Sequence, residues 1–136
     1  HEIRSGDISS RVSAVSAIPE VREKMVIIQR RIAGEQDCVL EGRDIGTVVF
    51  PNAEFKFFLI ADIDVRAKRR LIELEKMGET KTISELIEDI RRRDQLDSSR
   101  NHSPLIQADD AIPIDTSQLT INEQIKIIIN HINHNK

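Results

Sequence analysis

The segment DCVLEGRDIGTVVFPNAEFKFFLI, residues 37–60, decides how this chain folds. Two short apolar runs, residues 37–41 and 55–60, lie on either side of a turn that contains Arg43 and Asp44. The second run is nearly unbroken in apolar residues, as is typical of a strand covered on both faces. We therefore expect both runs to form strands. Because ligands bind beyond the carboxyl ends of the strands in an open parallel sheet, Arg43 and Asp44 are candidate ligand-binding residues.

Helical patterns surround this segment. Pro19 suits a first helical turn and Gly34 suits the position beyond a helix end, which predicts a helix over residues 19–33. The other expected helices are 8–18, 63–78 with Asp62 as its cap, 83–97 opened by a capping box of Thr82 and Glu85, and 121–136 opened by a capping box of Thr120 and Glu123.

Strands alternating with these helices indicate an α/β fold. A third strand is expected at residues 111–115, although Pro113 weakens its interior. The order predicts a three-layer arrangement, a mostly parallel sheet with flanking helices. The longer helices each carry an apolar stripe: Val21, Met25, Ile28 and Ile32; Val65, Leu71, Ile72 and Leu74; Ile83, Leu86, Ile87 and Ile90; Ile121, Ile125, Ile128 and Ile132.

The composition excludes several classes of protein. The 136 residues carry a net charge of −3, which argues against a general nucleic-acid coat, and their apolar runs are far shorter than a membrane span. Cys38 is the single cysteine, so an internal disulfide framework is excluded and a reducing compartment is favoured. We expect Cys38 to be a core residue of its strand. The four histidines lack partners for a zinc set, so no metal site is expected.

Thirteen of the twenty basic residues are arginine, whose planar guanidinium binds carboxylate or phosphate through paired hydrogen bonds. This favours a handler of small phosphorylated molecules, although solvated helix faces explain the same composition. Arg43 suits an anionic oxygen, and Asp44 suits an amine or a metal ion. A surface ion pair between the two is the alternative interpretation.

The second arginine-rich stretch is RRRDQLDSSR, residues 91–100. Arg93, Asp97 and Arg100 are four and three positions apart, so a helix places them on one face. A self-paired, solvated helix face explains that spacing. Four arginines in ten residues favour instead a mobile segment that closes over phosphates during phosphoryl transfer.

The stretches VSAVSAIPEVRE, EGRDIGTVVFPNAEFKFFLIADIDVRAKRR, IRRRDQLDSSRNHSPL and ADDAIPIDTS resemble, in order and spacing, the bacterial cytidylate kinases. These are nucleoside monophosphate kinases with a P-loop fold, and the resemblance covers nearly the whole chain from Ile3 onward. It implies a cytoplasmic, monomeric enzyme that transfers phosphate from ATP, with Mg²⁺, to CMP or dCMP. It implies neither a nucleic-acid partner nor a membrane.

The resemblance also assigns roles to residues of this sequence. It implies that residues 1–34 form the remainder of the CMP-binding region with the following helix, and that 35–136 form the core domain with a lid at 79–103. Arg93 and Arg100 match catalytic positions. The substrate-binding set that it implies is Ser13, Arg22 and Asp44 at the cytosine with Arg100 close by, Arg43 at the acceptor phosphate, and Arg93 and Asp97 near the sugar and the transferring group.

One family feature is absent. The ATP-binding motif G-x-x-x-x-G-K-[ST] does not occur in the 136 residues. In the family its strand lies between the strands that match residues 37–41 and 55–60, so these two would keep unpaired facing edges. We therefore expect the chain to be one piece of a larger kinase, inactive alone. A non-catalytic nucleotide-binding module and a kinase for another monophosphate are the alternatives.

Overall fold

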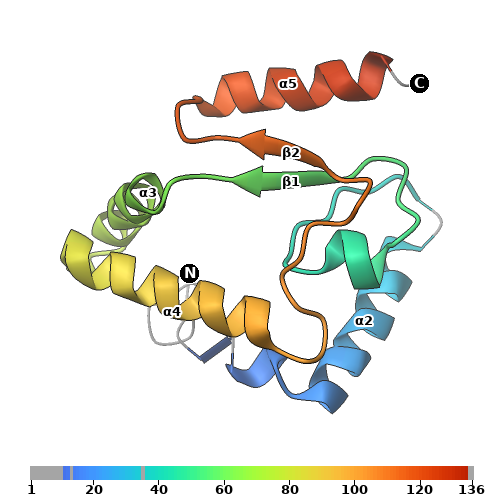
Figure 1. Cartoon of the computed structure of the whole chain (residues 1–136), viewed down its shortest axis with the longest axis horizontal. Helices are drawn as coiled ribbons and strands as arrows, with labels where there is room; N and C mark the ends of the chain where they lie inside the picture. The colour runs from blue at the N-terminus through green and yellow to red at the C-terminus, as the bar shows by residue number, and fades with distance from the viewer. Residues whose placement is uncertain (1–10, 13, 35, 135–136) are drawn as a thin grey trace.

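The computed structural model describes residues 11–12, 14–34 and 36–134, and within them helices and strands alternate as expected (Figure 1). Residues 11–12 and 14–16 are helical, and the rest of the helix expected at 8–18 lies partly outside the described residues. The elements that follow are α2 Pro19–Ala33, η2 Ile45–Val49, β1 Phe57–Ile60, α3 Ile63–Lys76, α4 Ile83–Ser99, β2 Ile112–Asp115 and α5 Ile121–His134.

The sheet of the described residues consists of β1 and β2, which pair in parallel. The register runs from Phe57 opposite Ile112 to Ile60 opposite Asp115. Pro113 lies opposite Phe58 within this ladder, so the third expected strand is confirmed despite its proline. Parallel strands need a long crossover, and here the helices α3 and α4 provide it. The α/β class with parallel strands is thus confirmed for this part of the chain.

The strand expected at residues 37–41 is wrong. These residues have no regular secondary structure, and Val39 is 101% exposed. Cys38 is likewise exposed, not a core residue. A strand exists only by pairing its backbone with a neighbour, and no described strand lies beside these residues. The apolar composition of residues 37–41 does not tell whether such a neighbour is present.

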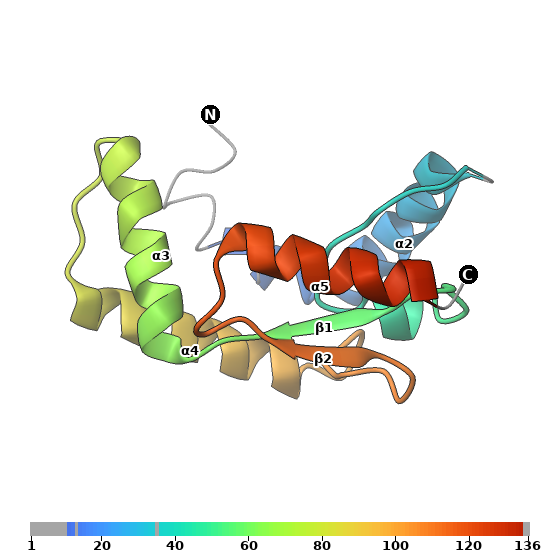
Figure 2. The ribbon, with the colours of Figure 1, turned by 90° about the horizontal axis from the view of Figure 1, so that it is seen from above.

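The expectation that β1 is covered on both faces is also wrong for the described residues. Leu59 and Ile60 are both exposed, while Phe57 and Phe58 are half-buried. Helix α5 runs beside the two strands (Figure 2), and the Phe57 and His131 rings meet with centroids 6.3 Å apart. One helix on one side cannot cover a strand from both faces.

The main core lies between α3 and α4. Ala67, Leu74 and Leu86 are buried there, packed against Leu71, Met77, Ile83, Ile87 and Ile90. The stripe predicted for residues 83–97 is therefore confirmed, whereas Ile72 of the α3 stripe is exposed.

The capping residues predicted for α3 and α4 differ in whether they cap. Thr82 and Glu85 form the predicted capping box of α4. Asp62 stands at the predicted cap position of α3, but its side chain makes no capping hydrogen bond. Instead its backbone N–H donates to the Ser117 hydroxyl at 2.9 Å. After α3, Gly78 adopts a φ of +77°, a left-handed turn that favours glycine and reverses the chain into α4.

Helix α2 has the predicted bounds, with Pro19 in its first turn and Gly34 at its end. Its predicted stripe is not the buried face: Met25 and Ile32 are exposed, and the buried residues are Val26 and Ala33. The choice of face depends on η2, which packs on this helix and could not be foreseen from periodicity.

Helix α5 begins with the predicted capping box of Thr120 and Glu123. None of its described residues is buried, and Ile121 and Ile125 of the predicted stripe are exposed. No described helix is both long and apolar enough to cross a membrane.

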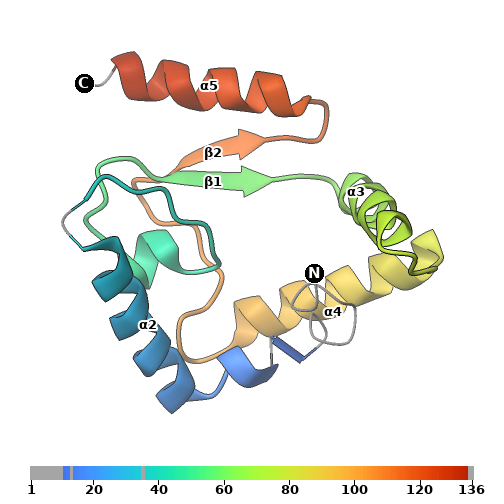
Figure 3. The ribbon, with the colours of Figure 1, turned by 180° about the vertical axis from the view of Figure 1, so that it is seen from behind.

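Helix α4 runs from the α3 end of the molecule back toward the start of α2 (Figures 1 and 3). Its last turns therefore approach α2 and η2, although they are far apart in the sequence. Of the residues predicted to bind a ligand, Arg22 lies on α2, and Arg93 and Asp97 lie on α4. Arg43 and Asp44 directly precede η2, and Arg100 directly follows α4.

Candidate functional site

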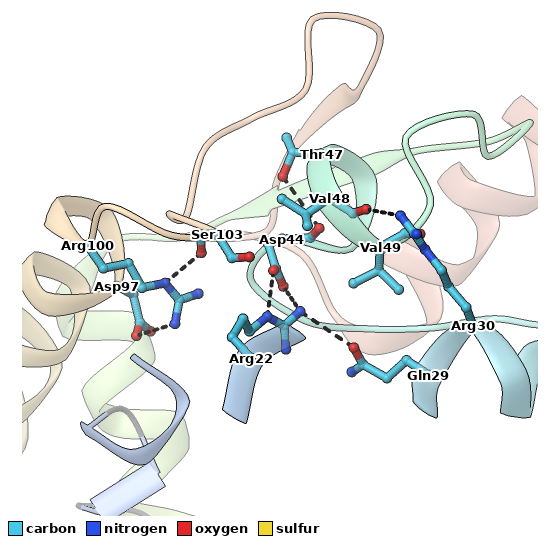
Figure 4. A network of polar contacts seen from close by, with 10 residues as sticks. All are labelled: Arg22, Gln29, Arg30, Asp44, Thr47, Val48, Val49, Asp97, Arg100 and Ser103. Atoms are coloured by element: carbon cyan, nitrogen blue, oxygen red, sulfur yellow. Dashed lines mark hydrogen bonds and ion pairs between the residues drawn. The ribbon is translucent and has the colours of Figure 1, made fainter. Parts of the chain in front are cut away.

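Asp44 is the N-cap residue of η2 and is only 3% exposed. Its carboxylate accepts two hydrogen bonds from Arg22 of α2, from Nε to Oδ2 at 2.8 Å and from Nη2 to Oδ1 at 2.5 Å (Figure 4). Arg22 Nη2 also donates to Gln29 Oε1 at 3.5 Å. One guanidinium therefore neutralises one buried carboxylate in the paired geometry that arginine favours.

Asp97, near the end of α4, is 2% exposed and contacts three arginines. Arg43 Nε donates to its Oδ2 at 2.9 Å. Arg93 Nε lies 3.7 Å from Oδ2, and Arg100 Nη1 lies 3.8 Å from Oδ1. Three positive charges against one negative charge give this cluster a net charge of +2. The predicted spacing of Arg93, Asp97 and Arg100 on one face is confirmed.

The neighbours Arg43 and Asp44 thus take partners on different helices. Arg43 contacts α4 through Asp97, and Asp44 contacts α2 through Arg22. The alternative of a surface ion pair between Arg43 and Asp44 is wrong, since Asp44 is buried and pairs elsewhere. The turn also does not follow a strand, since the residues before it have no regular secondary structure. Its ion pairs to α2 and α4 hold it in place.

Charge repulsion remains within the arginine cluster. Partial burial of the Arg93 guanidinium lowers its pKa, and the neighbouring charge of Arg43 lowers it further, while Asp97 and Asp94 raise it. Arginine stays charged at neutral pH in proteins. The single carboxylate of Asp97 therefore does not balance its neighbours, and an added anion would relieve their repulsion.

The sequence does not predict the π-helical backbone that follows Asp44. Residues 45–49 form a π-helical turn, a rare element that is frequent at functional sites. The N–H groups of Val48 and Val49 both donate to the Asp44 carbonyl, at 2.9 and 3.2 Å. Asp44 therefore anchors this turn through its backbone and contacts α2 through its side chain.

The two buried carboxylates line one cavity of about 160 Å³. This is less than the ~300–1,000 Å³ of typical small-molecule sites, and it suits a base or a phosphate more than a whole nucleotide. Six of the seven predicted substrate-binding residues line it: Arg22, Arg43, Asp44, Arg93, Asp97 and Arg100. Ser13 lies outside the described residues.

Five further residues line this cavity: Val12, Ser16, Gln29, Gly42 and Ile45. Gln29 had a sequence signal that was missed, because it lies two helical turns after Arg22 on α2. A second, larger cavity of about 530 Å³ adjoins the first, since Arg22 lines both.

The described residues offer no ready set of metal ligands. They contain no group of three or more His, Cys, Asp and Glu side chains suited to a metal ion. The two carboxylates of the site already pair with arginines. Mg²⁺ prefers carboxylate oxygens together with substrate phosphates, so this part of the chain does not fit a protein-held magnesium ion.

Comparison with known proteins matches residues 1–134 to a family described as cytidylate kinase. A cytidylate kinase of Clostridioides difficile is 47% identical over 132 residues, which cover 97% of this chain and 61% of that relative. One from Alkaliphilus oremlandii is 52% identical over 129 residues, covering 95% and 59%. One from Caldanaerobacter subterraneus subsp. tengcongensis is 49% identical over 134 residues, covering 98% and 60%. The chain thus spans about three fifths of the length of these relatives.

Proposed function

The chain belongs to the cytidylate kinase family, and on this premise we propose that it binds the acceptor nucleotide when ATP phosphorylates CMP or dCMP to the diphosphate. One observation carries the proposal: two buried carboxylates line the same cavity in different charge environments. Asp44 and Arg22 form a neutral pair, whereas the Asp97 cluster has a net charge of +2.

The neutral pair suits a neutral base. Cytosine presents an exocyclic amine beside a ring nitrogen and a carbonyl, so a carboxylate accepts from it and an arginine donates to it. Each carboxylate oxygen keeps a further acceptor site when Arg22 occupies one. Uracil exchanges donor and acceptor at two of these atoms and would leave Asp44 facing a carbonyl. Ser13 is proposed as a further contact to the base.

The positive cluster suits the acceptor phosphate, which carries close to two negative charges at neutral pH. Arg43 and Arg93 each contact Asp97 through one nitrogen, and a guanidinium has five N–H donors. Most of those donors are therefore directed elsewhere and can bind phosphate oxygens. Asp97 holds the arginines together and, in this proposal, also contacts the sugar.

The transfer step requires alignment and positive charge more than proton removal. We assign Arg93 and Arg100 to stabilising the charge of the transferring phosphoryl group, in addition to binding. Both belong to the lid, residues 79–103, which includes α4. Closure of the lid would bring these arginines onto the phosphates and exclude water.

In this proposal ATP is the phosphoryl donor and acts with Mg²⁺, and the described residues bind neither. The 136 residues contain no G-x-x-x-x-G-K-[ST], so in this proposal they provide the acceptor side and the lid, while other residues of the kinase bind the ATP phosphates. Mg²⁺ supplies charge neutralisation on those phosphates when bound. The proposed enzyme is a cytoplasmic monomer, with residues 1–34 in the CMP-binding region and 35–136 in the core domain.

The test is the acceptor preference of the purified gene product that contains this chain. With ATP and Mg²⁺ present, we expect CMP and dCMP to be phosphorylated far faster than UMP or AMP, with ADP formation as the readout. Binding of CMP without phosphoryl transfer would favour the non-catalytic module. Equal rates with AMP or UMP would favour a kinase for another monophosphate, and no binding of CMP would refute the proposal.

A further inference from the structure

The π-helical turn η2 is attached to α2 at both of its ends. At the first end, Asp44 accepts hydrogen bonds from Arg22. At the second end, Arg30 Nε donates to the Val49 carbonyl and Arg30 Nη2 donates to the Val48 carbonyl, both at 2.8 Å. Figure 4 shows Arg30 reaching from α2 to these two carbonyls.

The contacts of Arg30 satisfy groups that η2 cannot satisfy alone. The last carbonyls of a helix have no partner within it, and those of Val48 and Val49 are in this position. A positive charge is also favourable at the negative end of a helix. Val49 is 1% exposed, so water would be a poor substitute for the guanidinium.

Helix α2 thus acts as a rigid support for the turn. Arg22 and Arg30 are eight residues apart, about 12 Å along a helix at 1.5 Å per residue. They hold opposite ends of η2, and the Asp44 carbonyl accepts the bonds from Val48 and Val49 that start the turn. A shift of η2 would therefore move Asp44.

We propose that Arg30 is a positioning residue, which holds η2 on α2 and thereby directs the Asp44 carboxylate into the 160 Å³ cavity. Arg30 acts through the backbone and does not line that cavity. The inference rests on the proposed function, because base discrimination is the property that Asp44 would govern.

The expected effect is a loss of fit for the base. Losing the two hydrogen bonds in Arg30→Gln should raise KM for CMP by about 5–10-fold, since a net hydrogen bond contributes about 1 kcal/mol, which is about fivefold in an equilibrium constant. The preference for CMP over UMP should fall by a similar factor, while KM for ATP stays unchanged. Arg30→Lys should behave like Arg30→Gln, because lysine keeps the charge but lacks the planar fork.

The matched control is Arg31→Gln. Arg31 is exposed on the same last turn of α2, and its replacement removes the same charge. The experiment measures kcat and KM for CMP, UMP and ATP, with thermal unfolding, in the gene product that contains this chain. We expect Arg31→Gln to match the wild type in all of them.

Two results would overturn the assignment of Arg30. The first is a wild-type KM and base preference in Arg30→Gln or Arg30→Lys. The second is a fall in kcat and melting temperature with KM for CMP unchanged, which a merely structural role predicts. A wild-type protein without preference for CMP over UMP would instead refute the proposed function itself, whatever the Arg30 variants do.

Discussion

Asp44 and Asp97 are the buried acidic side chains of the described residues, but arginines surround them in different ways. Asp44 has one arginine at hydrogen-bonding distance on both oxygens. Asp97 has three arginines, of which one donates a hydrogen bond at 2.9 Å and two stand 3.7 and 3.8 Å away. The first arrangement is complete, whereas the second has more positive charge than its carboxylate can balance.

This difference suits the two carboxylates to the two roles proposed for them in one cavity. A complete, neutral pair is rigid and presents defined hydrogen-bonding atoms, which is what recognition of a neutral base requires. An excess of guanidinium groups creates a positive potential and keeps donors for an anion. In the proposed function, the same two residue types would support base recognition at Asp44 and phosphate binding at the Asp97 cluster.

Stability should respond most strongly at Asp44. Arg22→Gln leaves that buried carboxylate without its charge partner, so we expect the free energy of unfolding to fall by about 3 kcal/mol. Arg93→Gln makes the same chemical change at Asp97, which keeps Arg43 and Arg100, and its cost should stay within about 0.5 kcal/mol. Urea unfolding of the gene product that contains this chain measures both.

Equal destabilisation by the two variants would contradict this contrast. It would mean that the arginines around Asp97 are as tightly committed as Arg22 is to Asp44. The Asp97 cluster would then have no surplus donors for a phosphate.

Helix α2 carries Arg22, the partner of Asp44, and helix α4 carries Asp97 itself. These two helices also begin differently. Helix α2 starts after Ile18 with Pro19 in its first turn and no side-chain cap. Helix α4 starts with the Thr82–Glu85 capping box, and the hydrogen bonds from the Thr82 backbone and hydroxyl hold the pKa of Glu85 below its usual value of 4.5. The start of α4 is therefore sensitive to acid.

A lowered folded-state pKa means that the contribution of Glu85 is fully present above pH 4.5 and disappears as the pH falls through the lower, folded value. We expect Glu85→Gln to lower the urea midpoint slightly at pH 6 and by less at a pH well below 4.5. Glu88→Gln, an exposed change on the same helix, should have no effect at either pH. A constant difference between Glu85→Gln and wild type across this range would contradict the linkage.

The sequence predicts the helices well because their signals are local. Pro19, Gly34 and the two capping boxes act within one helical turn, and each lies where it was expected. The prediction of a strand at residues 37–41 is wrong, because a strand depends on a partner that is distant in the sequence. The predicted buried faces of α2 and α5 are wrong for the same reason, because packing against other elements decides which face of a helix is covered.

The site was predicted as a set of residues but not as a set of contacts. Charge density and family resemblance pointed to Arg22, Arg43, Asp44, Arg93, Asp97 and Arg100, which all line one cavity. Nothing in the sequence indicates that Asp44 pairs with Arg22 while its neighbour Arg43 pairs with Asp97. Nor does the sequence indicate the π-helical turn that follows Asp44, or the contact of Arg30 with the end of that turn.

The central claim is that the Asp44 pair recognises the base and the Asp97 cluster binds the phosphate. The most direct test is calorimetric titration of wild type, Asp44→Asn and Arg93→Gln with CMP, UMP and cytidine. Asp44→Asn should lose most of the preference for CMP over UMP, by about 10–100-fold for a charged hydrogen bond, and keep the preference for CMP over cytidine. Arg93→Gln should show the reverse. Loss of both preferences together in either variant would contradict the division of the cavity into two subsites.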